Sequence, residues 1–262
     1  MVVDMFGFES VSGAVAVWII VVVILSGLIQ GTLGFGFPFL ATPMLAMVVD
    51  MRTAIIMVLL PTVATVATMM FTCGPLAPVL RRFWLMPVYS VFGALAGTWI
   101  FVAAPTFPYQ LLLAALIFFY LNLDRISRGE WPLVRRHERA FAPVAGVAAG
   151  LFEGTANVAA PPLIIYYLAL GLTPAMLVTA LQISFLTGKI TQFSVMTWHG
   201  GVSMAQWTAT LPLAGFAMVG VIAGARMRNR IHAETYRVWV KRALLAIAFA
   251  LLAQYVYLNW LR

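Results

Sequence analysis

Long apolar stretches follow one another along almost the whole chain, separated by short segments that are polar or rich in Gly and Pro. Several of them approach the ~20 residues that a helix needs to cross the bilayer core. Apolar residues make up 63% of the 262 residues and charged residues only 9%, whereas soluble domains average about 45–50% and about 25%. We therefore predict an all-α polytopic membrane protein and exclude a soluble enzyme, a disulfide scaffold and a disordered chain. The apolar stretches cover residues 14–30, 38–49, 53–73, 84–104, 109–123, 142–152, 161–171, 175–198, 206–225 and 243–260.

The basic residues gather in three short stretches between the apolar ones. A formal net charge of +8 suggests a nucleic-acid partner when it is taken alone. However, thirteen of the sixteen Lys and Arg residues flank apolar stretches, which is typical of the positive-inside distribution of membrane proteins. We therefore expect the lipid bilayer, and no nucleic acid, as a partner. The thirteen are Arg81, Arg82, Arg125, Arg128, Arg135, Arg136, Arg139, Arg226, Arg228, Arg230, Arg237, Lys241 and Arg242.

The sequence contains no pattern typical of catalysis or metal binding. It has no Walker loop, nucleophile elbow or HExxH spacing, and the single Cys73 excludes a disulfide within the chain. Glu153 and His199 are the one candidate pair for catalysis, but their apolar stretches place them at different membrane depths. We expect no enzyme, no cofactor and no metal site.

Two pairs of short apolar stretches are each interrupted by a segment that breaks a helix. The first break, residues 31–38, contains three glycines and a proline, and the second, residues 153–162, ends in paired prolines. Irregular backbone at membrane depth is tolerated only where protein buries it or where it lines a watery cavity. We therefore predict broken short helices that meet at the bilayer midplane.

The two breaks are related by an internal repeat. Sliding the chain against itself by 123 residues superimposes them and matches Gly, Thr and Pro residues around both. We predict one transmembrane domain, 1–262, made of an N-terminal repeat 10–123, a basic cytoplasmic linker 124–141 and a C-terminal repeat 142–260. The matched pairs include Gly27 with Gly150, Leu28 with Leu151, Gly31 with Gly154, Thr32 with Thr155, Pro38 with Pro161, Gly93 with Gly220 and Gly97 with Gly224.

The basic residues also predict how the repeats are oriented. If each broken pair crosses the membrane once, the basic loop residues divide equally between the two sides. If each crosses an even number of times, all thirteen fall on one side, as the positive-inside rule prefers. We therefore predict inverted-topology repeats with loops 74–83, 124–141 and 226–242 in the cytoplasm. Both two crossings and a re-entrant hairpin satisfy this count.

The breaks have the composition of an anion site. A helix restarting at Pro38 or at Pro161 and Pro162 directs free N–H groups and the positive end of its dipole into the break. Glycines there allow close approach of the backbone to a ligand, whereas Gly93, Gly97, Gly220 and Gly224 have the spacing of a helix contact face. The predicted substrate-binding residues are Gly31, Thr32, Gly34, Gly36, Phe37, Pro38, Gly154, Thr155, Asn157, Pro161, Pro162, Lys189 and Gln192.

Glu153 and Lys189 are ionisable residues inside apolar stretches. A charge in the hydrocarbon costs at least about 2.5–3.5 kcal/mol, so such residues pair with one another or serve transport. Three hypotheses remain open: a structural ion pair, an anion site in which Lys189 attracts the anion and Glu153 carries a proton, or a solvated vestibule. Their repeat partners are Gln30 and Val66, so the charges belong to the C-terminal repeat alone.

The residues 27–37, with Pro43 beyond them, and the segments Gly150–Thr155 and Pro161–Leu163 resemble the TauE/SafE sulfite exporter (TSUP) family. The basic segment 224–231 is similar to the last basic loop of that family. The resemblance implies transport of sulfite or an organosulfonate across the bacterial cell inner membrane, usually as export. Residues 157–160 are bulkier than the glycines that family members often carry there, which leaves the exact substrate open.

We therefore predict a secondary transporter, an exporter of a small anion such as sulfite or an organosulfonate, working by alternating access with Glu153 as candidate proton carrier. A passive anion channel on the same architecture is the alternative, and a structural subunit of a larger complex is a third. The expected partners are a small anionic substrate and the bilayer, and the sequence also allows a homodimer.

Overall fold

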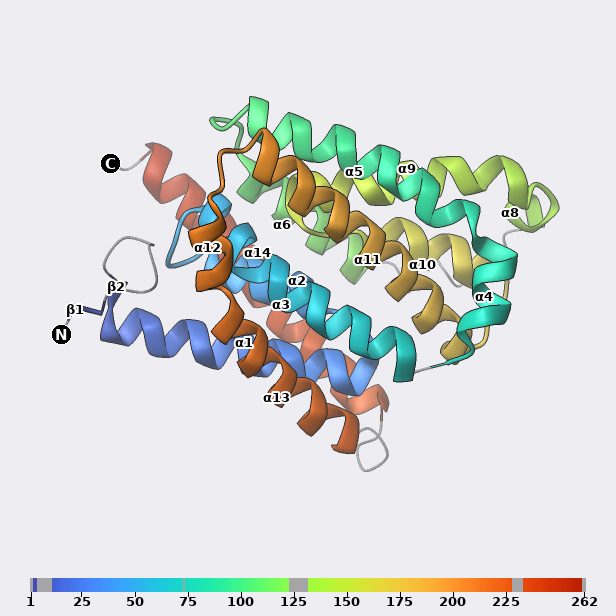
Figure 1. The fold of residues 1–262 in the computed structure, drawn as a ribbon, viewed down its shortest axis with the longest axis horizontal. Coiled ribbons are helices and arrows are strands. Elements are labelled where there is room, and N and C mark those ends of the chain that lie inside the picture. The colour runs from blue at the N-terminus through green and yellow to red at the C-terminus, as the bar shows by residue number, and fades with distance from the viewer. Residues whose placement is uncertain (1, 4–10, 73, 123–131, 228–232, 261–262) are drawn as a thin grey trace. The chain divides into compact units, whose positions relative to one another are not determined.

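The computed structural model describes residues 2–3, 11–72, 74–122, 132–227 and 233–260, which are almost entirely helical (Figure 1). The exception is a short antiparallel ladder between β1 (Val2–Val3) and β2 (Val11–Ser12). The predicted all-α class is therefore confirmed apart from these two strands. Five residues named above lie outside the described residues: Cys73, Arg125, Arg128, Arg228 and Arg230.

Every predicted apolar stretch contains a helix, and each predicted break contains a shorter gap between two helices, residues 34–36 in the first and 157–159 in the second. Helices end close to the predicted limits because each stretch ends at Gly, Pro, Asn or charged residues that favour turns. The helices are α1 (Gly13–Leu33), α2 (Phe37–Leu45), α3 (Met51–Thr72), α4 (Leu76–Phe83), α5 (Leu85–Ala103), α6 (Tyr109–Leu121), α8 (Pro132–Arg136), α9 (Glu138–Ala156), α10 (Ala160–Ala169), α11 (Pro174–Trp198), α12 (Met204–Ala209), α13 (Leu211–Met227) and α14 (Ala233–Trp260).

Four segments of the described chain are long and apolar enough to cross a membrane: α1, α3, α5 and the segment Met204–Met227 formed by α12 and α13. Shorter apolar helices cover Tyr109–Leu121, Ala160–Ala169 and Leu244–Val256. Helix α11 is 25 residues long but carries several Gln, Ser and Thr residues and Lys189. Many of these polar side chains are buried by neighbouring helices, as polar groups in a membrane protein require.

The three basic stretches are more helical than predicted. We expected loops over 74–83, 124–141 and 226–242, but α4 fills most of the first, α8 and the start of α9 lie in the second, and α14 begins inside the third. Helix α4 buries Val79 and Phe83, four residues apart, and carries Arg81 and Arg82 in its last turn. That pattern gives a short amphipathic helix with cations at its negative end, which stabilises it.

The helices pack into two units, which are described separately. Unit 1 contains residues 1–65 and 200–262, and unit 2 contains residues 66–199. Each unit therefore includes helices from both predicted repeats, and helix α3 contributes to both units. The repeat assignment itself stays a prediction.

In unit 1, α1 packs closely along α13 through facing glycines (Figure 1). A methyl group at Gly27 would collide with the backbone carbonyl of Ala217, so the helices approach closely only because side chains are missing there. We call this contact the α1–α13 glycine seam. Its glycines are Gly27 and Gly31 of α1 and Gly220 and Gly224 of α13.

In unit 2, α5 and α9 pack against each other in the same way (Figure 1). A methyl group at Gly150 would collide with the backbone carbonyl of Ser90. The α5–α9 glycine seam contains Gly93 and Gly97 of α5 and Gly150 and Gly154 of α9. The prediction that Gly93, Gly97, Gly220 and Gly224 form helix contact faces is therefore confirmed.

Candidate functional site

The second break lies in unit 2, between α9 and α10. Helix α9 ends at Ala156, and Asn157 follows it with φ 64°, the left-handed conformation that Asn tolerates better than most residues. The Asn157 N–H donates to the Glu153 carbonyl oxygen at 2.9 Å, and the Val158 N–H donates to that of Phe152 at 3.2 Å. Helix α10 then begins at Ala160 with a proline in its first turn, as the sequence predicts.

Lys189 of α11 faces this break and is fully buried. Its Nζ donates to the side-chain carbonyl of Asn157 and to Gln192 Oε1, the latter at 2.8 Å. The same Nζ lies 3.4 Å from Glu153 Oε1 on α9, which is also buried. The structure thus brings together four of the predicted residues, Glu153, Asn157, Lys189 and Gln192, and we call them the polar cluster.

Gln192 connects the polar cluster to the end of α9. Its Nε2 lies 3.3 Å from the Glu153 carbonyl oxygen and 3.5 Å from that of Gly154. Carbonyls in the last turn of a helix have no partner within that helix and need another donor when they are buried. Gln192 supplies that donor while its Oε1 accepts from Lys189, so one side chain orients both the lysine and the helix end.

The Glu153 carboxylate is only half satisfied. Its Oε1 pairs with Lys189, whereas its Oε2 is buried and has no hydrogen-bond partner among the described residues. Gly188, one residue before Lys189, leaves the space that Oε2 occupies, and a methyl group at Gly188 would overlap that oxygen. A buried carboxylate oxygen without a donor favours the protonated form of the group or a ligand that brings a donor.

The first break lies in unit 1 and contains no charge. Gly34 and Gly36 have φ of 90° and 116°, which explains why glycine is needed at both positions. Gln30, buried at the end of α1, accepts from the Phe37 N–H through Oε1 at 2.9 Å. We expected the first N–H groups of α2 to face a ligand, but this one binds Gln30, and Pro38 in the same turn has none.

Several predicted ligand residues have contacts within the protein. Gly31 and Gly154 lie in the two glycine seams, where a neighbouring helix occupies the space beside each backbone. The Thr32 hydroxyl donates to the Leu28 carbonyl oxygen at 3.0 Å, and that of Thr155 to the Leu151 carbonyl oxygen at 2.8 Å. These hydroxyls bond to their own helices in this conformation, and each has to give up that bond before it can donate to a ligand.

Sequence reasoning selects neither Gly188 nor a capping role for Gln30. Gly188 resembles any small residue on a buried helix face, and its importance comes from a carboxylate on another helix. In the sequence, Gln30 stands out only as the repeat partner of Glu153. Among the described residues, no three His, Cys, Asp or Glu side chains are grouped closely enough to hold a metal ion.

Comparison with known proteins identifies the family of the chain. No curated protein and no solved structure matched the chain. A sequence model of a family described as "Sulfite exporter TauE/SafE" matches residues 19–253, which include both breaks, both glycine seams and the polar cluster. The chain therefore belongs to the sulfite exporter TauE/SafE family, whose members are multi-pass membrane transporters of small anions and not enzymes.

Proposed function

We propose that this protein is a secondary transporter that exports sulfite or a small organosulfonate across the bacterial inner membrane by alternating access. The observation that carries this proposal is the buried Lys189 beside the second break. A buried ammonium attracts an anion strongly because little water screens it. Among the described residues only one carboxylate, Glu153, forms an ion pair with it.

The ion pair suggests how anion and proton movements are coupled. With Glu153 ionised, its Oε1 neutralises Lys189 and the cluster has no net charge. When Glu153 accepts a proton, for which the unpartnered Oε2 is the available atom, the charge of Lys189 is left for a monovalent anion. Binding one proton and one anion together then leaves the net charge of the polar cluster unchanged, which avoids the cost of burying a lone charge.

The packing of the helices supports movement of one repeat against the other. The α1–α13 and α5–α9 glycine seams each join one helix from each predicted repeat. Small residues allow packed helices to slide without large side chains interlocking, and binding sites at the breaks of repeats are typical of secondary transporters. Inverted repeats and alternating access are therefore part of this proposal.

Flux of sulfite into proteoliposomes, measured with and without a pH gradient, tests the proposal. We expect a saturable flux that responds to the gradient, and a Glu153→Gln variant that loses this response while it still binds the anion. Glu138→Gln is the matched control, because Glu138 is partly exposed and pairs with Arg82 at 3.4 Å, away from Lys189.

The alternative is a passive anion channel. A channel predicts flux that does not saturate and that is unchanged in Glu153→Gln. The absence of flux for sulfite, for small sulfonates and for carboxylates would contradict both mechanisms.

A further inference from the structure

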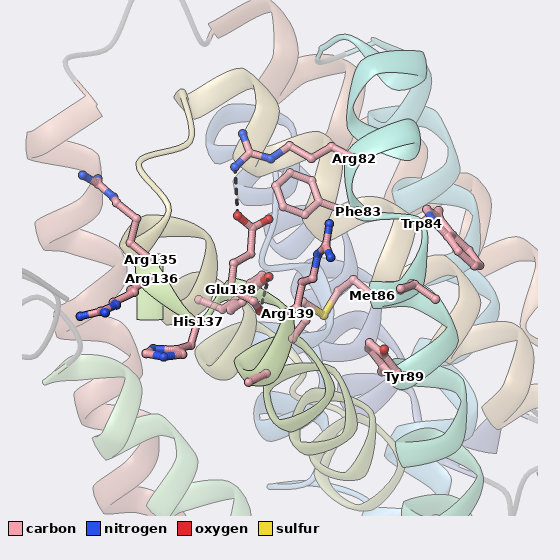
Figure 2. A pocket seen from close by; sticks show the side chains of 14 residues that line it. Arg82, Phe83, Trp84, Met86, Tyr89, Arg135, Arg136, His137, Glu138 and Arg139 are labelled. Atoms are coloured by element: carbon pink, nitrogen blue, oxygen red, sulfur yellow. Dashed lines mark hydrogen bonds and ion pairs between the residues drawn. The ribbon is translucent and has the colours of Figure 1, made fainter. Parts of the chain in front are cut away.

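A second polar site in unit 2 lies outside the polar cluster. It is a pocket of about 990 Å³ where the end of α4 and the start of α5 face α8 and the start of α9 (Figure 2). Its lining includes Arg82, Arg135, Arg136 and Arg139, and Glu138 is its one carboxylate among the described residues. We call it the basic pocket.

The charges of the basic pocket are largely unneutralised. Arg82 forms an ion pair with Glu138 at 3.4 Å, which Figure 2 shows as a dashed line. The Arg82 guanidinium also lies over the Phe83 ring. Arg135, Arg136 and Arg139 are exposed and form no ion pair with any residue that the structure describes. Over residues 124–139, which include the undescribed Asp124 and Glu130, five arginines outnumber three acidic residues. Helix α9 also begins at Glu138, and its positive end adds to the field.

The surface beside the basic pocket is apolar. Trp84 at the pocket is 57% exposed, and Leu85, which also lines it, is 40% exposed. Val88 and Phe92 continue from Leu85 along α5 at helical spacing and are exposed as well. An exposed tryptophan beside arginines is typical of the membrane interface, where lipid headgroups meet acyl chains.

We propose that the basic pocket binds an anionic phospholipid, with its phosphate between Arg82 and Arg139 and an acyl chain along the exposed face of α5. Figure 2 shows Arg139 extending toward Arg82, whereas Arg135 and Arg136 extend the other way and add only to the positive field. Basic pockets beside membrane helices on the cytoplasmic side are suited to lipid phosphates, and the positive-inside rule predicts that side for these arginines. Guanidinium groups bind phosphate oxygens through paired N–H donors. This inference does not depend on the transported anion.

Native mass spectrometry of the purified protein with phosphatidylglycerol or phosphatidylcholine tests it. We expect the wild type to retain phosphatidylglycerol in preference to phosphatidylcholine. The double variant Arg82→Ala, Arg139→Ala should bind phosphatidylglycerol about 25-fold more weakly, since each interfacial arginine contributes about fivefold. The pair Arg82→Lys, Arg139→Lys keeps both positive charges but loses the paired N–H donors, so its affinity should lie between those of the wild type and the alanine variant.

The matched control is Arg226→Ala, Arg242→Ala, which removes two exposed arginines of unit 1. Its phosphatidylglycerol affinity should equal that of the wild type, and the thermal midpoint of all variants in phosphatidylcholine shows that they are folded. Equal loss in both double variants would mean general charge attraction and would overturn the pocket. Displacement of phosphatidylglycerol by millimolar inorganic phosphate would identify a soluble-anion site instead and would also overturn the proposal.

Discussion

The two breaks share a backbone plan and differ in chemistry. At each, a helix ends, a residue with positive φ follows, and a new helix starts with proline in its first turn. At the first break a neutral amide, Gln30, binds the new helix. At the second, Glu153 and Lys189 form a buried ion pair. Since the first break is held without any charge, the charges of the second are not needed to interrupt a helix, which favours a role in transport.

Removing the cation of the second break should have the largest effect. Lys189→Met leaves Glu153 as an unpaired buried group, and breaking a buried pair costs about 3–5 kcal/mol of unfolding free energy. We expect a clear fall in the thermal midpoint in detergent together with the loss of anion flux.

The matched double variant separates stability from function. Glu153→Gln with Lys189→Met makes the second break neutral, like the first, and should recover most of the lost stability without recovering flux. A double variant that transports normally would show that the ion pair is structural only.

Substitutions in the two glycine seams should destabilise the protein to a similar extent. Gly31→Ala and Gly154→Ala each place a methyl group against the backbone of a neighbouring helix, and such overpacking costs about 1–3 kcal/mol. We expect similar falls in thermal midpoint for both variants. Gly215→Ala on α13 is the control, because a methyl group there meets no atom within 4 Å and should not destabilise. A fall at only one seam would contradict the equivalence.

The smallest effect is expected at the neutral break. Gln30→Met leaves the buried Phe37 N–H without its partner and should cost about 1 kcal/mol or slightly more. The response of flux to a pH gradient should remain, because the second break is unchanged. Loss of that response would show that the first break takes part in proton coupling, and the contrast drawn between the breaks would be wrong.

The positions of the helices could be predicted because they depend on local sequence. Apolar stretches end at Gly, Pro or charge, so α1, α3, α5 and α11 lie close to their predicted limits. The pairing of Lys189 with Glu153 could also be predicted, because ionisable residues inside the hydrocarbon tend to pair with one another.

The partners of particular side chains could not be predicted, since they depend on contacts between distant segments. Gly31 has the composition of a ligand loop, yet it lies in the last turn of α1 because α13 packs there. Gly188 matters only through Glu153, and Gln30 only through the N–H of a helix that begins seven residues later. The first basic stretch forms a helix because Val79 and Phe83 of α4 are buried, which a charge count does not reveal.

The α1–α13 glycine seam has a consequence for biosynthesis. Helix α1 is synthesised before its partner α13, which at 5–20 residues per second emerges roughly ten to forty seconds later. Unit 2 is continuous in sequence and has all its helices before α13 is synthesised. Helix α1 therefore waits with its glycine face exposed to lipid until α13 is made, and unit 1 completes its packing only after every helix of unit 2 has been synthesised.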